Sequence, residues 1–275
     1  VIDPKGSRGE IIELDGLKVQ LPHPPRDRSK ILFSDLPKRE QYWRREEMPK
    51  GLTYENHEPY MDYIMEQFRR RREGVWFMNN GKPTWLSPKH WMQLQWGKMF
   101  DDGIYASYRH AQLLLYYHKE ACYIDTRCMG QIFLKSRQTG YTYGMVSDSI
   151  ELITRTKGSR TGLTSMTDED ARKAFNKLSY IFQEWPFFFQ PVTKGKVDSP
   201  TNLTFGKPSN STKEEKKKKN TSTDGYVNSV TDFEATKVKA YDGQSMKLYI
   251  GDESAKWDRA SYIEHLNTLL PTTFR

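Results

Sequence analysis

Residues 131–144 have side chains suited to phosphate binding, in the order Gln-Ile-Phe-Leu-Lys-Ser-Arg-Gln-Thr-Gly-Tyr-Thr-Tyr-Gly. The apolar triplet Ile132-Phe133-Leu134 enters a polar loop that ends in Gly140 and Thr142, and an amphipathic segment follows. Strand, loop and helix in this order are the context that a phosphate-binding loop needs. Both ends of such a loop lie near the anion, so we expect the long ammonium of Lys135 to reach it from the start of the loop.

The loop departs from the usual pattern, in which a lysine stands directly after the second glycine. Here that position holds Tyr141, and the first-glycine position holds Lys135. Glycine and threonine are also ordinary turn and cap residues, so a degenerate loop of this kind is weak evidence alone. A nucleotide site further requires an acidic motif at the end of a later strand.

Residues 248–253, Leu-Tyr-Ile-Gly-Asp-Glu, supply that acidic motif. Phosphoryl transfer needs one carboxylate to hold Mg²⁺ and a second that orients and deprotonates the attacking water. We assign the first role to Asp252 and the second to Glu253. The two motifs together predict a nucleotide-hydrolysing site.

Composition and charge favour a folded protein with an anionic partner. The chain has 275 residues, 13% of them aromatic, and a formal net charge of +8. This length allows one large domain, or one domain with a smaller appendage. Residues 207–219 contain six lysines and two glutamates, a net charge of +4. We interpret this run as a solvated loop, with nucleic-acid contact as the alternative. For Arg69–Arg72 a charged helix end is favoured over a DNA contact.

Other sequence features exclude several classes of protein. No apolar run approaches the roughly 20 residues of a membrane span and no signal peptide begins the chain, so we expect a soluble intracellular protein without a membrane partner. Cys122 and Cys128 have no histidine at ligand spacing, and we interpret them as reduced thiols rather than metal ligands or a disulfide. The six histidines are scattered and predict no metal cluster.

The order of expected elements predicts three regions. Residues 1–58 form an extended, proline-rich arm, 59–129 a helical and hairpin lid, and 130–275 the catalytic core. In the lid we expect a helix over about 60–72, a hairpin around an Asn-Gly turn at 79–82, a helix capped by Ser87 that runs to about 100, and a helix over about 107–121.

The core is predicted to alternate between strands and helices. We expect strands at 132–134, 161–164, 203–205, 226–230 and 246–250, with helices from the loop to Gly158, from a Thr167 capping box to Trp185, and around 260–270. Such alternation indicates an α/β fold with a mainly parallel central sheet.

The motifs taken together resemble the large terminase subunit of tailed bacteriophages, the ATPase that drives DNA into the procapsid. Residues 135–142 are similar to the deviant Walker A motif of that family, in which some members carry the lysine at the start of the loop. Residues 248–257, LYIGDESAKW, resemble its Walker B strand, and residues 79–87 with the Trp-rich helix after them resemble its N-terminal region. The resemblance covers about residues 60–275 and implies a P-loop ATPase of the RecA-like, catalytic-glutamate type.

The resemblance also implies roles for individual residues. Lys135 and Thr142 would contact phosphate and Mg²⁺, Arg137 would sense or stabilise the γ-phosphate, and Asp252 and Glu253 keep the roles given above. An adenine-contacting glutamine is expected upstream of the loop, with Gln112 as the first choice and Gln95 as the second. The nucleotide-binding loop would comprise Lys135, Ser136, Gln138, Thr139, Gly140, Tyr141 and Thr142, with Thr142 and Asp252 at the metal.

The family context predicts the cofactors ATP and Mg²⁺ and several macromolecular partners. These are double-stranded DNA bound without sequence specificity, the portal protein, the small terminase subunit and further copies in a ring, all in the cytoplasm of the infected bacterial host. In terminases a nuclease domain follows the ATPase. This chain ends after the expected helix at 260–270, so we expect no DNA cleavage from it.

Two other functions remain open at this point. Another P-loop translocase, such as a helicase-like or transposition ATPase, would require an arginine finger from a second RecA-like domain, for which 275 residues leave no room. A non-catalytic DNA-binding or scaffold protein with a decayed loop predicts no nucleotide affinity. Measured nucleotide binding distinguishes this last possibility from the first two.

Overall fold

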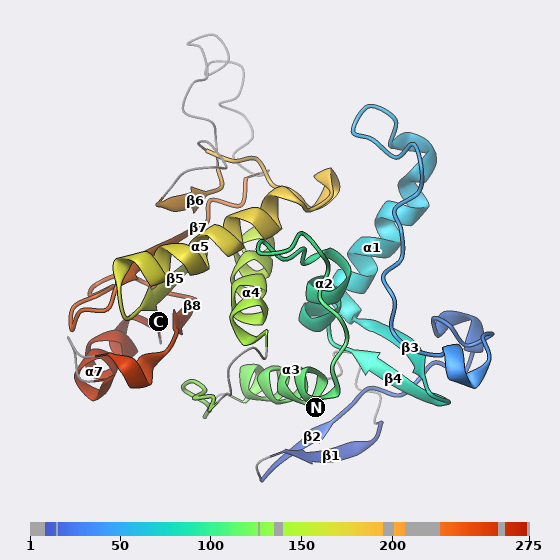
Figure 1. Cartoon of the computed structure of the whole chain (residues 1–275), viewed down its shortest axis with the longest axis horizontal. Helices are drawn as coiled ribbons and strands as arrows, with labels where there is room; N and C mark the ends of the chain where they lie inside the picture. Colours follow the sequence, from blue (N-terminus) through green and yellow to red (C-terminus); the bar gives the residue numbers. More distant parts are fainter. Residues whose placement is uncertain are drawn as a thin grey trace. The chain divides into compact units, whose positions relative to one another are not determined.

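The computed structural model describes residues 9–14, 16–125, 127–134, 140–194, 201–206, 226–257 and 262–273. The chain divides into two compact units, and Figure 1 labels their helices and strands. The first comprises Val1–Gly97 with Tyr105–Thr139, and the second comprises Lys98–Ile104 with Gly140–Arg275. The limits expected from sequence, after residues 58 and 129, stay predictions.

The first unit contains two antiparallel hairpins. The strands β1 (Ile11–Leu14) and β2 (Leu17–Gln20) form one, and β3 (Val75–Asn79) and β4 (Lys82–Leu86) form the other. Asn80 and Gly81 both have positive φ, 48° and 85°, as a two-residue hairpin turn of the favoured hand requires. The predicted Asn-Gly hairpin is therefore confirmed.

The helices of the first unit are α1 (Met61–Glu73), α2 (Pro88–Trp96) and α3 (His110–Ile124). The Ser87 hydroxyl accepts a hydrogen bond from the N–H of His90 at 3.4 Å, which confirms the predicted cap. The helix after it ends at Trp96 rather than near residue 100, because Gly97 closes it with a bond from its N–H to the Gln93 carbonyl. Buried aromatic and aliphatic side chains fill the core of this unit, among them Phe77, Leu86, Trp91, Leu94 and Tyr116.

The N-terminal segment is more structured than an extended arm. Besides the β1–β2 hairpin it contains the short 3-10 helices η1 (Arg28–Lys30), η2 (Lys38–Glu40) and η3 (Glu58–Tyr60). Apolar side chains spaced along it, Leu21, Ile31, Trp43 and Leu52, are each less than 10% exposed. Burial of widely spaced apolar residues holds the segment against its unit without long regular elements.

The second unit is built on a mixed, mostly parallel sheet, so the chain has an α/β fold as predicted. Its strands are β5 (Arg160–Ser165), β6 (Asn202–Thr204), β7 (Val230–Ala235) and β8 (Leu248–Gly251), in the order β6-β7-β5-β8. The central strand β5 pairs in parallel with β7 and β8, and the edge strand β6 is antiparallel to β7. A Cβ on Gly162 would meet Tyr241 and Met246 at 2.5 Å or less, so only glycine fits there.

Helices α4 (Tyr141–Arg155) and α5 (Asp168–Gln183) contact β5 and β7, and α7 (Tyr262–Thr273) follows β8. The Thr167 hydroxyl accepts a hydrogen bond from the N–H of Asp170 at 3.1 Å, which confirms Thr167 as the predicted cap, and the same hydroxyl donates to Asp170 Oδ2 at 2.7 Å. The described part of this unit also contains two short 3-10 helices, η4 (Phe187–Phe189) and η5 (Ser254–Lys256). None of the helices in the described part of the chain is long and apolar enough to cross a membrane.

Two predicted strands are wrong. Residues 131–134 form no strand, and the side chains of Ile132 and Leu134 are 71% and 100% exposed. No described strand pairs with this segment, so its backbone lacks the ladder hydrogen bonds that define a strand. Residues 226–229 are also not a strand, since Asn228 has a left-handed φ of 52° and the strand begins only at Val230.

Candidate nucleotide-binding site

One residue of each predicted motif takes part in a direct hydrogen bond within the second unit. Thr142 lies in the first turn of α4, and Asp252 follows β8 directly. The Thr142 Oγ1 donates to Asp252 Oδ2 at 3.1 Å, across 110 residues of sequence. The backbone N–H of Asp252 donates to the Thr164 carbonyl at 2.9 Å, so hydrogen bonding to β5 continues one residue past the strand and fixes the carboxylate. The fold thus brings together the residues assigned to the metal.

Gly140 shapes the start of α4. It has φ 73° and ψ 12°, a left-handed conformation that glycine adopts at no steric cost, and it stands at the N-cap position without a side-chain cap. The first N–H groups of a helix have no partners within the helix, and the helix dipole favours negative charge beside them. The start of this 15-residue helix can therefore bind an anion next to Thr142.

The acidic turn after β8 is held by several local contacts. Glu253 has φ 51° and ψ 36°, a left-handed conformation that is uncommon for a residue with a Cβ. Its N–H donates to Asp252 Oδ1 at 3.0 Å, and its carboxylate forms an ion pair with Lys256 at 2.8 Å. Both side chains are more than 40% exposed, so this ion pair is weak and can open.

Trp257 closes the same turn. Its indole N–H donates to the Asp252 carbonyl at 3.1 Å. A Cβ added to Gly251 would lie 2.9 Å from Cη2 of the indole ring, so only a glycine allows the ring this close to the end of β8. The sequence LYIGDESAKW thus folds into a strand and a tight turn that carries the carboxylates of Asp252 and Glu253 and the ammonium of Lys256.

Tyr141, at the usual lysine position, does not supply a positive charge. Burial raises the pKa of its hydroxyl, and the negative charges of Asp148 and Asp252 raise it further. The phenol therefore stays neutral at physiological pH, since its ordinary pKa is already about 10. A positive charge beside the start of α4 would therefore have to come from another residue or from a metal ion.

A chain of hydrogen-bonded polar side chains links β8 to β5 and to α7. The Thr164 hydroxyl is hydrogen-bonded to the Tyr249 hydroxyl, which is 2.7 Å from Nε2 of His265, and Nδ1 of His265 is 3.0 Å from the Lys237 carbonyl. A carbonyl only accepts, so Nδ1 carries the proton and Nε2 accepts from Tyr249. His265 is fully buried on α7. Sequence reasoning missed this network, because nothing in the pattern links Tyr249 to a histidine 16 residues later.

The Thr142–Asp252 pair suits a magnesium ion, which prefers oxygen ligands and takes one or two from the protein beside waters and phosphates. A hydroxyl and a carboxylate oxygen at 3.1 Å offer that donor set. Among the described residues there is no group of three or more His, Cys, Asp and Glu side chains placed to hold a metal. Bound there, Mg²⁺ would neutralise phosphate charge.

Much of the predicted loop lies outside the part of the chain that the structure describes. Lys135, Ser136, Arg137, Gln138 and Thr139 all lie outside the described residues, as does the lysine-rich run 207–219. Their predicted roles stay predictions.

The two candidate glutamines belong to the first unit. Gln112 lies on α3 with a half-buried side chain, and its proposed contact with adenine stays a prediction. Gln95 on α2 is 1% exposed, and its amide donates to the Glu46 carbonyl at 2.7 Å and accepts from the Glu46 N–H at 3.2 Å. The donor and the acceptor of this amide group are both hydrogen-bonded to the backbone of Glu46. Gln95 is therefore a poor candidate for contacting a base.

The arginine cluster at the end of α1 is engaged with carboxylates. Arg69 pairs with Glu66 and Glu73, and Arg70 pairs with Glu66 and with Glu46. These ion pairs favour the charged helix end over a DNA contact. Comparison with known proteins adds no further assignment, because no family model matches the chain and no curated protein matches it either.

Proposed function

We propose that this chain binds and hydrolyses ATP with Mg²⁺, and that it is the ATPase region of a viral DNA-packaging motor similar to the large terminase subunit. The observation that carries the proposal is the hydrogen bond between Thr142 and Asp252. It joins the hydroxyl of a glycine-led helix start to the carboxylate at the end of a parallel strand, which is where α/β proteins bind phosphate.

Each residue of the site has a distinct role in this proposal. The N–H groups at the start of α4 and the ammonium of Lys135 bind the phosphates, and Thr142 and Asp252 would hold the Mg²⁺. Glu253 orients a water molecule and accepts its proton while the water oxygen attacks the γ-phosphorus and the bond to the β–γ bridging oxygen breaks. Arg137 stabilises the negative charge that develops on the transferred phosphoryl group.

The wider function follows from the resemblance and the net charge of +8. Hydrolysis would power the movement of double-stranded DNA into a procapsid, in a ring of copies on the portal, with the small terminase subunit as a further partner and the host cytoplasm as the location. Basic side chains would contact DNA phosphates without reading sequence, so DNA binding should weaken steeply with added salt.

Steady-state ATP hydrolysis with Mg²⁺, measured with and without double-stranded DNA, tests the proposal. We expect turnover by the wild-type chain, and its loss in Lys135→Ala, in Glu253→Gln and on addition of a chelator. Glu264→Gln is a matched control, because this exposed glutamate lies on α7 and has no assigned role. Full activity in Glu253→Gln would refute the site assignment, and absence of both nucleotide binding and hydrolysis would refute the function.

A further inference from the structure

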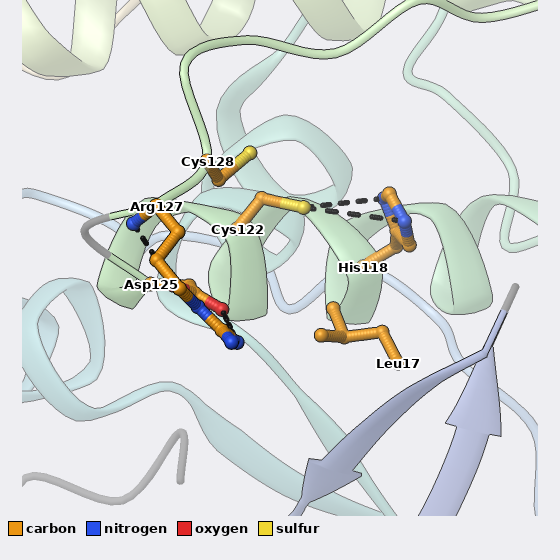
Figure 2. A pocket seen from close by; sticks show the side chains of 6 residues that line it. All are labelled: Leu17, His118, Cys122, Asp125, Arg127 and Cys128. Atoms are coloured by element: carbon orange, nitrogen blue, oxygen red, sulfur yellow. Dashed lines mark hydrogen bonds and ion pairs between the residues drawn. The ribbon is translucent and has the colours of Figure 1, made fainter.

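The two cysteines of the chain meet in one surface cavity of the first unit. Cys122 lies in the last turns of α3, and Cys128 follows the turn after the helix, where its N–H donates to the Asp125 carbonyl at 2.9 Å. Leu17, His118, Asp125 and Arg127 complete the cavity lining, as Figure 2 shows. Both thiols are free and half-buried. The sequence alone favours two unrelated reduced thiols, but the fold places them side by side.

The two thiols lie in the lining of the same cavity. Burial raises the pKa of the Cys122 thiol, Gln131 opposes that shift, and the neighbouring Cys128 raises the pKa further. The sulfur of Cys122 also points toward His118, with 3.8 Å between Sγ and Nδ1 (Figure 2). Cys128 in turn donates to the Gly130 carbonyl at 3.3 Å. Thiol–disulfide exchange can pass between two sulfurs only when they can touch, and the shared cavity holds both cysteines in one small region of the surface.

We propose that Cys122 and Cys128 form a dithiol site that reacts with a low-molecular-weight disulfide, such as glutathione disulfide, and closes to an intramolecular disulfide. One cysteine thiolate attacks a sulfur of the oxidant, the oxidant's S–S bond breaks, and one glutathione thiolate leaves. The second cysteine thiolate then attacks the protein sulfur of this mixed disulfide and releases the second glutathione. The protein loses two electrons and two protons, and the oxidant becomes two thiols.

The position of the site gives the bond a structural consequence. A disulfide here would join the end of α3 to the segment 128–134, which directly precedes Lys135 in the sequence. Asp125 and Arg127, which form an ion pair of 2.7 Å, lie between the two cysteines in sequence. Their backbone would therefore become part of the covalent ring that the disulfide closes. The dithiol site does not depend on the proposed ATPase function, so either can fail without the other.

Intact-mass spectrometry of the full chain after incubation with glutathione disulfide tests the proposal. We expect a product two hydrogens lighter than the reduced chain, resistant to alkylation by N-ethylmaleimide after denaturation, and restored by dithiothreitol. The Cys128→Ser and Cys122→Ser variants should each react only as far as the mixed disulfide, in which the remaining cysteine carries one glutathione.

Three results would overturn the proposal. They are a wild-type chain that carries glutathione on both cysteines, a chain linked to a second copy through a disulfide, and a chain whose two thiols both remain open to alkylation. The assay on the wild-type chain needs no substitution, so a variant that folds poorly cannot obscure the answer.

Discussion

Two apolar stretches of this chain look alike in sequence and differ in structure. Leu248–Gly251 and Ile132–Leu134 each precede residues with assigned chemistry, yet the first forms β8 and the second forms no strand. Ile250 is 5% exposed and pairs across from Leu163 of β5, whereas Leu134 is 100% exposed. The difference shows that an apolar run becomes a strand only when a neighbouring strand takes up its backbone hydrogen bonds.

The same comparison separates the two halves of the proposed site. The acidic half rests on β8, where Trp257 and the Asp252 backbone fix the turn. The phosphate half, where it is described, rests on α4, and Thr142 is placed by that helix rather than by the segment before the loop. Contact between the halves through Thr142 and Asp252 therefore does not require a strand at 132–134.

The largest expected effect is on turnover at the acidic half. Glu253→Gln removes the proposed general base and should lower kcat by about 100-fold or more, since general bases contribute about 10²–10⁴-fold. Nucleotide affinity should stay within about threefold of wild type, because this carboxylate is not assigned a contact with the nucleotide. Single-turnover hydrolysis and equilibrium binding measure the two quantities, and a variant that loses binding in step with kcat would show that Glu253 has a different role.

Truncation of matched apolar side chains tests the strand comparison itself. Ile250→Ala should lower the free energy of unfolding of the second unit by about 2–5 kcal/mol, because it leaves a cavity in the core. Leu134→Ala should change stability by less than about 0.5 kcal/mol, because the side chain is fully exposed. Chemical unfolding followed by tryptophan fluorescence gives both values, and equal losses would mean that residues 132–134 are packed in solution.

Thr142 offers a graded test of the contact between the halves. Thr142→Ala removes the hydroxyl that bonds Asp252 and should lower kcat/KM for MgATP by about 10- to 100-fold, of the order lost when a charge-assisted hydrogen bond is removed. Thr142→Ser keeps the hydroxyl and should stay within about threefold of wild type. If serine fails to rescue, the methyl group rather than the hydroxyl matters.

A smaller effect is expected at the ion pair that holds Glu253. Lys256→Met should raise kcat by about two- to fivefold, because it frees the carboxylate at the cost of an exposed ion pair worth no more than about 1 kcal/mol. Lys256→Arg keeps the pair and should behave as wild type. A decrease in kcat for the methionine variant would instead make the ammonium part of the active site.

The smallest effect concerns a contact away from the chemistry. Asp101 accepts hydrogen bonds from Lys177 at 3.0 Å and from the Tyr143 hydroxyl at 2.9 Å, and both lower its pKa below 3.8, the Lys177 bond most. A lowered pKa in the folded state adds stability above the unfolded pKa, and this stability is lost as the pH falls through the folded value.

Because the Asp101 side chain is 58% exposed, Asp101→Asn should cost no more than about 0.5 kcal/mol. Urea unfolding of the wild-type and Asp101→Asn proteins at pH 7 and at pH 2.5 measures the difference between their free energies of unfolding. This difference should be smaller at pH 2.5. If the difference in free energy of unfolding is the same at both pH values, the effect of the substitution does not come from the charge of Asp101.

Local patterns predicted much of the fold. The Asn-Gly turn, the caps at Ser87 and Thr167 and the α/β alternation all rest on contacts within a few residues, and each was found. The failures, at 132–134 and 226–229, depend on partners distant in sequence or on one left-handed backbone angle at Asn228. Neither cause is visible in a period-two apolar pattern.

The same division applies to the candidate site. The role of Asp252 was predicted from its acidic motif and that of Thr142 from the resemblance, and the structure has a hydrogen bond of 3.1 Å between the two side chains. The Tyr249–His265 bond and the Lys256 ion pair were not predicted, because they depend on how α7 and the turn at 252–257 pack.

The most direct test of the central claim is a double-mutant cycle on Thr142 and Asp252, read out as Mg²⁺-dependent binding of a fluorescent ATP analogue. If the two residues form one magnesium site, Thr142→Ala and Asp252→Ala should each remove the gain in nucleotide affinity that Mg²⁺ provides. The double variant should then bind the nucleotide no more weakly than Asp252→Ala alone. Losses that simply add, or an unchanged magnesium dependence in both single variants, would contradict the account.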